Sequence, residues 1–380
     1  MKLKLFYATN RRHEGADRWR PEGYGKDFSS DGMENLRFGR LTMEVDEEIV
    51  ARHLNRRKGS DPDRGDGEAL AGYLARRAGE DADIRAYGER LNRKISDVHQ
   101  PNARLGSRAL FQDLRAAMLS GCDVLVYVHG FNVSWEEAVG SALALQLMLN
   151  RRRREQADKE VRVMLFTWPS DGLALPYVSY KSDRSDAQGS GYAFGRGLLK
   201  LRDHLTGLKR DGEDCQQALH LLCHSMGNYV LQATLARMRE FAAARGLPRL
   251  FEHIFLCAAD VDDDVLEPGK PMGDLHRLAR GVSIYHNRGD LAMYVSDYTK
   301  GHPDRLGHEG AARPGQLHRK IHQVDCSSLV EGLVEHSYYL WGPVNSDIRQ
   351  TIDGLPPGDP ARRRTQSGSH DNVWVMTGAM

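Results

Sequence analysis

The sequence contains few cysteines, and none of them is spaced like a metal ligand or a redox pair. Its 380 residues include five cysteines, at positions 122, 215, 223, 257 and 326. An odd number without a Cys-x-x-Cys spacing argues against a disulfide framework and against a zinc knuckle. We therefore expect small, buried cysteines at strand ends and no bound metal.

Long apolar runs are also absent. No stretch approaches the roughly 20 apolar residues needed to span a bilayer. The first residues reach polar Thr9, Asn10 and Arg11 before the apolar core of a signal peptide can form. The simplest interpretation is a cytoplasmic protein without a membrane span.

An excess of charge of one sign is likewise absent. The 53 basic and 52 acidic residues leave a formal net charge of +1, so no overall field attracts nucleic acid or an anionic membrane. Two arginine runs, at 151–154 and 362–364, fit a solvated helix end and a disordered tail. We expect no nucleic-acid partner, and nothing in the sequence indicates the oligomeric state.

The sequence does have a repeated rhythm between about residues 107 and 341. A short apolar or β-branched run is followed by a turn containing Gly, Asp, Asn or Ser and then by a helical pattern. This rhythm predicts parallel strands joined by crossover helices. The expected strands are 124–128, 161–167, 218–223, 253–258, 282–285 and 321–326, and the expected helices are 107–119, 134–154, 192–205, 226–244 and 328–339.

Two N-terminal strands, 3–8 and 38–45, complete the predicted sheet as an antiparallel edge. We expect an α/β fold in which about eight mostly parallel strands have helices on both faces, in a single domain over residues 1–354. Residues 55–105 read as a polar insertion with surface helices near 70–77 and 84–91. Residues 355–380 read as a flexible tail.

The segment around Ser225 has the pattern of a nucleophile elbow. An apolar strand leads into Cys223-His224-Ser225-Met226-Gly227, and a helical pattern starts at once. In such strand–turn–helix elbows a serine is held at the strand's end between small neighbours, usually as Gly-x-Ser-x-Gly. Here Cys223 replaces the first glycine, which weakens the match, and a serine that only caps the helix is the alternative.

A second turn, after strand 124–128, fits an oxyanion hole. His129-Gly130-Phe131-Asn132 follows this strand upstream of the candidate nucleophile, where related enzymes place one oxyanion amide. We assign the backbone amides of Met226 and Phe131 to this hole, with Asn132 as the alternative to Phe131. Ser134 and Glu137 further predict a capping box for the next helix.

The other triad members should follow in the order acid, then histidine, each beyond a strand of the same sheet. Asp290 lies in a polar loop after strand 282–285, and His336 follows strand 321–326. His336 would be the general base, and Asp290 would hold its tautomer. Asp260, which closes the preceding strand, is the rival acid.

With these segments in place, the chain resembles the bacterial α/β-hydrolases catalogued as domain of unknown function 900. The resemblance covers most of residues 1–345 and rests on segments 6–11, 126–132, 166–172, 221–228, 258–262, 289–292 and 336–338. It implies the α/β-hydrolase fold, a triad of Ser225, Asp290 and His336, and a hydrolase whose substrate it does not name.

Residues 169–194 contain several aromatic side chains and follow a strand. This segment is either a lid over the site or a packed connection in which Asp183 and Asp186 bond only to local backbone. The candidate substrate contacts are His129, Trp168, Tyr180 and Asp260.

The expected reaction is hydrolysis of a carboxylic ester, with a small-molecule acyl substrate and no cofactor, because the triad and the oxyanion hole suffice for acyl transfer. Thioesterase, lipase and amidase variants of this chemistry remain open. A non-catalytic binding or scaffold protein on the same fold is the alternative from another class.

Overall fold

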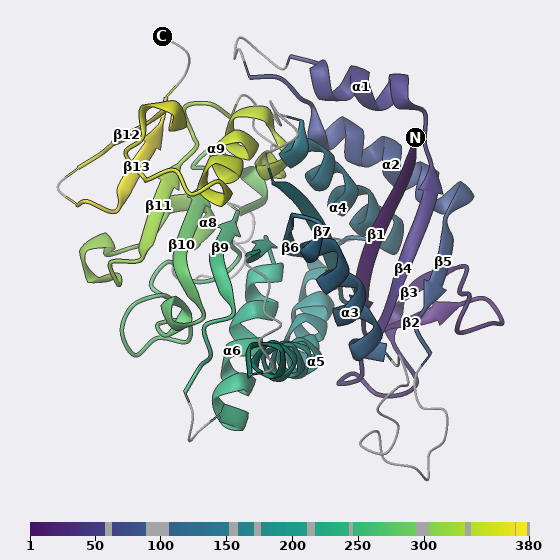
Figure 1. Ribbon diagram of the computed structural model, residues 1–380. Coiled ribbons are helices and arrows are strands. Elements are labelled where there is room, and N and C mark those ends of the chain that lie inside the picture. Colours follow the sequence, from purple (N-terminus) through teal and green to yellow (C-terminus); the bar gives the residue numbers. More distant parts are fainter. Residues whose placement is uncertain are drawn as a thin grey trace.

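A large sheet of mostly parallel strands forms the centre of the computed structural model (Figure 1). The structure describes residues 1–57, 63–88, 106–151, 159–170, 176–210, 217–242, 246–293, 304–330, 336–368 and 370–377. Over these residues the sheet has eleven strands in the order β12-β13-β11-β10-β9-β8-β6-β7-β1-β4-β5. Their bounds are β1 Lys2–Thr9, β4 Arg37–Glu44, β5 Asp83–Ala86, β6 Cys122–Val128, β7 Glu160–Thr167, β8 Leu219–His224, β9 Phe251–Cys257, β10 Ala279–His286, β11 Ile321–Asp325, β12 Arg364–Gln366 and β13 Val373–Met376.

The predicted α/β architecture is confirmed, but the sheet is larger than the expected eight strands. Strands β1, β7, β6, β8, β9, β10, β11 and β13 run parallel to their neighbours in this series, whereas β4, β5 and β12 pair antiparallel at the two edges. The expected antiparallel edge begins between the two N-terminal strands, because β1 is parallel to β7 and antiparallel to β4. A separate two-stranded sheet consists of β2 Arg11–Glu14 and β3 Gly23–Phe28.

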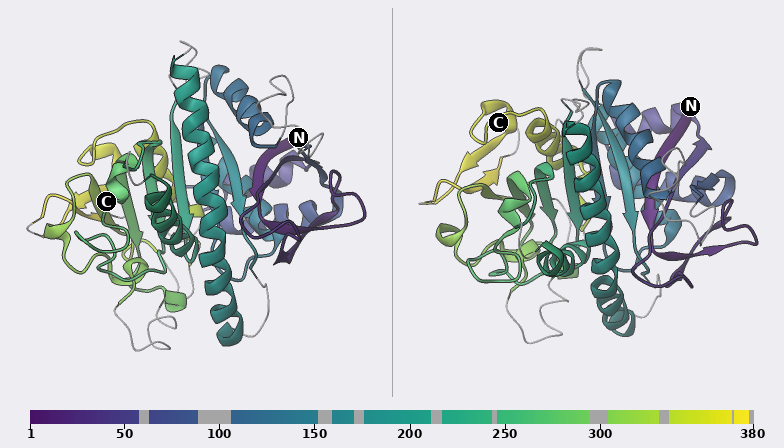
Figure 2. Two further views of the ribbon diagram at one scale, coloured as in Figure 1. Left: turned by 90° about the horizontal axis from the view of Figure 1, so that it is seen from below. Right: turned by 60° about the horizontal axis from the view of Figure 1, so that its bottom comes forward.

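Helices cover both faces of the sheet (Figures 1 and 2). One core contains side chains of α1 Glu47–Asn55, α2 Gly67–Asp81, α4 Trp135–Asn150 and α9 Gly342–Ile352. The other contains side chains of α3 Gly106–Leu119, α5 Pro176–Arg210 and α6 Gly227–Ala242. The remaining short helices are α8 Leu306–Glu309, η2 Leu275–Arg277, η3 Pro314–Gln316, η4 Tyr338–Leu340 and η5 Pro360–Arg362.

Strand β6 shows why the central strands could be predicted from the sequence. All seven of its residues are buried, with Val124 and Val126 in one core and Leu125 and Tyr127 in the other. A strand buried on both faces is a nearly continuous apolar run. The helix after it, α4, begins with the predicted capping box between Ser134 and Glu137.

The polar insertion expected at residues 55–105 is part of the main fold where the structure describes it. Helix α2 is a core helix rather than a surface helix: a side chain at Gly140 of α4 would approach the Ala71 carbonyl oxygen within 2.4 Å. The helix expected at 84–91 is instead strand β5 over residues 83–86, and residues 89–105 lie outside the described residues. The alternation of polar and apolar residues in β5 fits an edge strand with one exposed face.

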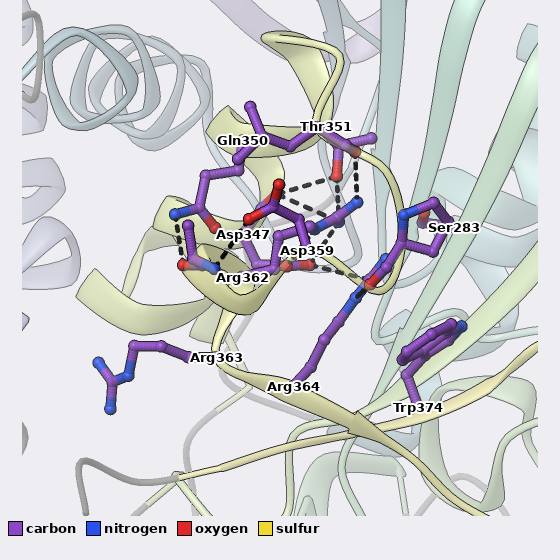
Figure 3. A network of polar contacts seen from close by, with 12 residues as sticks. Ser283, Asp347, Gln350, Thr351, Asp359, Arg362, Arg363, Arg364 and Trp374 are labelled. Atoms are coloured by element: carbon purple, nitrogen blue, oxygen red, sulfur yellow. Dashed lines mark hydrogen bonds and ion pairs between the residues drawn. The ribbon is translucent and has the colours of Figure 1, made fainter.

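The C-terminal segment is not the flexible tail that its composition suggests, because it adds β12 and β13 to the sheet. Figure 3 shows Arg362 and Arg364 converging on Asp347 of α9. The Asp347 carboxylate lies 2.8 Å from Arg362 Nε and 3.3 Å from Arg364 Nη1, and it accepts a 2.6 Å hydrogen bond from the Tyr285 hydroxyl. The two arginines, expected to lie in a disordered tail, are instead buried against a shared carboxylate.

Replacing Asp347 by alanine should therefore destabilise the fold strongly. Removing one partner of a buried ion pair leaves the other charge uncompensated, at a cost of about 3–5 kcal/mol. We expect Asp347→Ala to lower the free energy of unfolding by this amount in urea denaturation. Asp353→Ala, at the C-cap of the same helix and in a partly exposed pair with Arg349, should cost about 1 kcal/mol or less; equal costs would contradict this account of the C-terminal segment.

Three further segments differ from expectation. The helix predicted at 328–339 is absent where the segment is described: Ser328 lies in a turn, and Tyr338–Leu340 form a single 3₁₀ turn, while 331–335 lie outside the described residues. Arg151, expected to be solvated, donates hydrogen bonds to the Gly342 carbonyl and the Ser346 hydroxyl. Helix α5 is longer than the predicted 192–205.

Among the described residues, no helix is both long and apolar enough to cross a membrane.

Candidate active site

Ser225 lies at a strained turn at the C-terminal end of β8, immediately before α6. Its φ of 51° is in the left-handed region, which non-glycine residues rarely adopt. The Ser225 amide donates to the Cys257 carbonyl at 2.9 Å, and the Ser225 carbonyl accepts from the amides of Asn228 and Asp260. These bonds hold the unfavourable conformation, which is typical of a nucleophile elbow.

The two glycine positions of the elbow pattern have different roles in this chain. At Gly227 a Cβ atom would come within 2.6 Å of the His129 carbonyl oxygen and 2.7 Å of the Val128 carbonyl oxygen, so α6 can pass β6 only with glycine there. At position 223 the structure tolerates cysteine, because the Cys223 side chain is completely buried in the core beneath α5 and α6. The departure from the usual pattern therefore does not prevent the turn.

The structure brings two of the three predicted triad members into direct contact. His336 Nδ1 lies 2.7 Å from Asp290 Oδ2, and Asp290 is completely buried. The other oxygen of Asp290 accepts from the amides of Ala292 and Met293. This carboxylate is therefore fixed, and it orients the imidazole so that Nδ1 donates to it and Nε2 carries no proton.

The third predicted contact, between His336 and Ser225, is not a hydrogen bond in this structure. Within the described residues, the Ser225 hydroxyl has no hydrogen-bond partner. The histidine nevertheless lies beside the elbow: the ring centroids of His224 and His336 are 4.7 Å apart, and His224 Nε2 donates to the His336 carbonyl at 3.1 Å. His224, which the sequence interpretation did not single out, thus ties the histidine segment to the elbow.

The His129-Gly130 turn abuts the candidate nucleophile, as predicted. A Cβ atom at Gly130 would lie 2.7 Å from Ser225 Cβ, so glycine is needed for this approach. Within the described part of the chain, the amides of Phe131 and Met226 have no hydrogen-bond partner and remain candidates for an oxyanion hole. The Asn132 amide is not a candidate, because it donates to Asp183 Oδ2 at 3.0 Å.

Asp183 of α5 binds the turn at residues 129–132, the candidate oxyanion turn. This buried carboxylate accepts from the Asn132 amide and, at 2.5 Å, from the Ser170 hydroxyl. Ser170 in turn accepts from the Val133 amide at 3.1 Å. Of the two interpretations of residues 169–194, the one in which Asp183 bonds only to local backbone is therefore wrong for this residue, because its partner lies 51 residues away in the sequence.

Asp183→Asn should lower kcat for ester hydrolysis about 10- to 100-fold, because a charge-assisted hydrogen bond contributes about 1.5–3 kcal/mol. We expect KM to change little, since Asp183 acts through the position of the turn rather than through bound substrate. Steady-state kinetics on Asp183→Asn and on Asp203→Asn, an exposed carboxylate of the same helix, measure the difference. A loss confined to thermal stability would show that Asp183 has only a structural role.

His129 and Trp168, predicted as substrate contacts, are instead completely buried. His129 Nε2 accepts from the Trp168 amide at 3.2 Å and is 2.9 Å from the Thr167 hydroxyl, and the two aromatic rings stack. Arg11 reaches the same group, donating to Thr167 and to the Val133 carbonyl. Burial lowers the pKa of Arg11 to about 10, so its charge persists at neutral pH.

Asp260 and Tyr180, the other two predicted contacts, bond to each other beside the elbow. The Tyr180 hydroxyl donates to Asp260 Oδ2 at 2.6 Å, and the Tyr180 ring packs 5.6 Å from that of Phe131. Asp260 Oδ1 lies 3.4 Å from Nε of the buried Arg305. The Asp260 carboxylate thus binds Tyr180 and Arg305, whereas the Asp290 carboxylate binds His336. This difference favours Asp290 as the triad acid.

Buried histidines should make the fold sensitive to mild acid. Burial holds the pKa values of His129, His224 and His286 below the usual 6.5, so the unfolded chain binds protons first as pH falls. Their contribution is complete above about pH 6.5 and is lost below it, by up to about 1.4 kcal/mol per pH unit for each histidine. Urea denaturation at pH 7 and pH 5 should show a drop of more than about 2 kcal/mol; equal stabilities would contradict this.

No cluster of three or more metal-ligating side chains occurs among the described residues. The candidate site combines the elbow serine, the Asp290–His336 pair and the backbone amides of Phe131 and Met226. This set of groups is suited to acyl transfer.

Comparison with solved structures finds lipases and esterases. Aspergillus fumigatus lipase B is 11% identical, with a TM-score of 0.36, over 65% of this chain and 56% of that one, so the chain spans little more than half the lipase. A hyperthermophilic esterase from the archaeon Pyrobaculum calidifontis is 10% identical, with a TM-score of 0.30, over 85% of this chain and 80% of that one. No curated protein matches the sequence.

The family comparison covers the whole site. Residues 109–348, more than half of the chain, match the family described as alpha/beta hydrolase of unknown function (DUF900). These residues include β6 to β11, the elbow, the oxyanion turn and the Asp290–His336 pair. The chain belongs to this family of α/β hydrolases.

Proposed function

We propose that this hydrolase is a serine esterase that cleaves a carboxylic ester through an acyl-enzyme on Ser225. The observation that carries the proposal is the combination of a serine at φ 51° with a hydrogen bond between His336 and the buried Asp290 on the neighbouring loops. A serine hydroxyl needs an adjacent base to become a nucleophile at neutral pH. We assign this role to His336, whose ring lies 4.7 Å from that of His224 in the elbow.

In the proposed first half-reaction, Ser225 Oγ attacks the ester carbonyl carbon while His336 Nε2 takes its proton. The C–O bond to the alcohol then breaks, and His336 returns the proton to the leaving oxygen. Asp290 stabilises the imidazolium that forms between these steps. In the second half-reaction water attacks the acyl-enzyme by the same route and releases the carboxylic acid and free Ser225.

The amides of Met226 and Phe131 are the proposed oxyanion donors. A preorganised donor that faces the developing negative charge contributes about 3–4 kcal/mol to transition-state stabilisation. The Ser225–His336 hydrogen bond is expected to form when substrate binds, because catalytic hydrogen bonds are often long in free enzymes and shorten in the complex. Tyr180 and Asp260, beside Phe131, are the proposed substrate contacts.

We also infer that the chain is one domain, because strands from residue 2 to residue 376 share one sheet. This extends the proposed domain beyond the expected end at 354. A cytoplasmic location remains a prediction, as does the substrate's character as a small molecule. Residues 169–194 are the proposed lid segment, of which residues 171–175 lie outside the described residues.

Hydrolysis of 4-nitrophenyl esters of increasing acyl length tests the proposed reaction directly. We expect saturable, enzyme-dependent release of 4-nitrophenol for at least one chain length, with thioester and amide analogues defining the range. A correctly folded sample that hydrolyses none of these compounds would contradict the proposal and favour a binding protein on the same fold.

A further inference from the structure

The side chain of Arg184 lies beside the nucleophile elbow. Arg184 belongs to α5, and its guanidinium carbon lies 4.1 Å from the ring centroid of Tyr229. Tyr229 is in the first turn of α6, which begins just after Ser225. Helices α5 and α6 pack closely, because a Cβ atom at Gly191 would come within 2.5 Å of the Ala233 side chain (Figure 1). The guanidinium therefore lies against the helix that leads away from the candidate nucleophile.

A chain of hydrogen bonds joins Arg184 to the same turn. Arg184 Nη1 donates to the Tyr180 hydroxyl at 3.4 Å, and this hydroxyl donates to Asp260 Oδ2 at 2.6 Å. The Asp260 amide in turn donates to the Ser225 carbonyl at 3.2 Å. The Tyr180 ring also packs against the ring of Phe131, whose amide is a proposed oxyanion donor. Arg184 thus approaches the elbow from the side of the proposed substrate contacts.

The positive charge of Arg184 is not matched by a direct carboxylate contact. Asp260 attracts the guanidinium, but the Tyr180 hydroxyl separates the two groups, and Asp260 Oδ1 lies 3.4 Å from Nε of the buried Arg305. Among the described residues, no carboxylate forms an ion pair with Arg184, and its remaining N–H groups have no hydrogen-bond partner. The side chain is partly exposed, so a ligand can reach these donors.

An arginine in this setting is suited to bind an anion that is part of a larger, mostly apolar molecule. A guanidinium stacked on an aromatic ring keeps its planar edge available, and that edge matches the two oxygens of a carboxylate. The rings of Phe131, Tyr180 and Tyr229 are all partly exposed. They offer apolar surface beside the elbow for the uncharged part of such a molecule.

We propose that the ester substrate carries a carboxylate away from the scissile bond, and that Arg184 binds this carboxylate. The inference rests on the proposed function of Ser225, and it makes Arg184 a specificity-determining residue. The carboxylate can belong to the acyl chain or to the alcohol, since both extend from the carbonyl carbon that Ser225 attacks. Because the carboxylate does not change in the reaction, its contact with Arg184 should lower KM rather than raise kcat.

Matched esters test a carboxylate on the acyl chain. Mono-4-nitrophenyl suberate and 4-nitrophenyl octanoate have acyl chains of equal length, which end in a carboxylate and in a methyl group; the adipate and hexanoate esters form a shorter pair. The quantity to compare is the ratio of kcat/KM for the charged ester to kcat/KM for its neutral partner. We expect Arg184→Gln to lower this ratio about tenfold, the lower end of the range for a hydrogen bond to a charged group, because the site is partly exposed.

A second pair of esters tests a carboxylate on the alcohol. These are 4-(butanoyloxy)benzoate and 4-methylphenyl butanoate, whose hydrolysis is followed by titration of the released acid at constant pH. A tenfold fall of the charged-to-neutral ratio in Arg184→Gln with this pair places the carboxylate on the alcohol, and the same fall with the first pairs places it on the acyl chain. In either case Arg184→Lys, which keeps the charge without the planar fork, should recover part of the ratio.

Arg196 provides the matched control on the same helix. It is exposed and donates to the Glu34 carbonyl at 3.5 Å. Arg196→Gln should leave all the ratios unchanged, and melting temperatures check that each variant folds. If the esters are hydrolysed and Arg184→Gln changes the ratio with none of the pairs, the inference is overturned and the proposed esterase reaction stands.

Binding without turnover separates the inference from the reaction. Titration calorimetry of Ser225→Ala compares monomethyl suberate with dimethyl suberate, which has no free carboxylate. We expect about tenfold tighter binding of the monoester, and loss of this preference when Arg184→Gln is added. If the wild type hydrolyses none of the esters but this preference is found, the anion site stands and the reaction is wrong. Absence of an Arg184-dependent preference in Ser225→Ala would overturn the anion site.

Discussion

Ser225→Ala is expected to lower kcat for ester hydrolysis by about a million-fold, the effect found when the catalytic serine is removed from a triad. Without Oγ no acyl-enzyme can form, and only transition-state stabilisation by the oxyanion donors and substrate binding remain. The comparison of initial rates of the wild type and the variant on the best 4-nitrophenyl ester measures this effect.

The same variant should fold normally. The Ser225 hydroxyl has no hydrogen-bond partner among the described residues, and alanine meets the same backbone constraint as serine at φ 51°. We therefore expect the free energy of unfolding to stay within about 0.5 kcal/mol. Ser337→Ala, next to His336 and without a side-chain capping bond, is the matched control and should retain activity. Residual turnover by Ser225→Ala within tenfold of the wild type would exclude Ser225 as the nucleophile.

Asp290→Asn is expected to reduce kcat by about 10,000-fold, because an amide at this position favours the wrong tautomer of the histidine. Asp290 accepts from His336 Nδ1 at 2.7 Å and is completely buried. An asparagine could donate to Nδ1 instead, which would place the proton on Nε2 and remove the base. Steady-state kinetics over the neutral pH range would detect this loss.

Asp260→Asn is the matched comparison, since Asp260 is the rival acid. Its carboxylate bonds to Tyr180 and lies near Arg305, so its replacement should act mainly on KM and stability and change kcat by less than about tenfold. The reverse order of effects, with Asp260→Asn the more damaging to kcat, would transfer the acid's role to Asp260.

The interior of the fold was predictable from sequence, because each central parallel strand is an apolar run followed by a turn. The edges were not. Strand β5 is short and alternates polar with apolar residues, and β12 consists of Arg364-Thr365-Gln366. The arginine-rich C-terminus looks disordered until Asp347 is brought beside it by α9, and that pairing depends on tertiary structure rather than local sequence.

The candidate site, like the fold, was predictable from the sequence only in part. Ser225, Asp290 and His336 were found because each follows a strand of the sheet, in the chain order that the hydrolase pattern requires. The contact of Asp183 with the Asn132 amide was not predicted, because it joins two segments that are distant in the sequence. His224 could have been found, since it stands within the elbow pentapeptide; the sequence alone does not reveal that its ring reaches the His336 carbonyl.

Labelling with a fluorophosphonate tests the central proposal most directly, because this reagent forms a stable adduct with an activated serine. We expect one equivalent to be incorporated by the wild type, with the adduct on the peptide that contains Ser225 in tandem mass spectrometry. Ser225→Ala should incorporate none. Equal labelling of the two proteins, or an adduct on another serine, would contradict the assignment of Ser225 as the nucleophile.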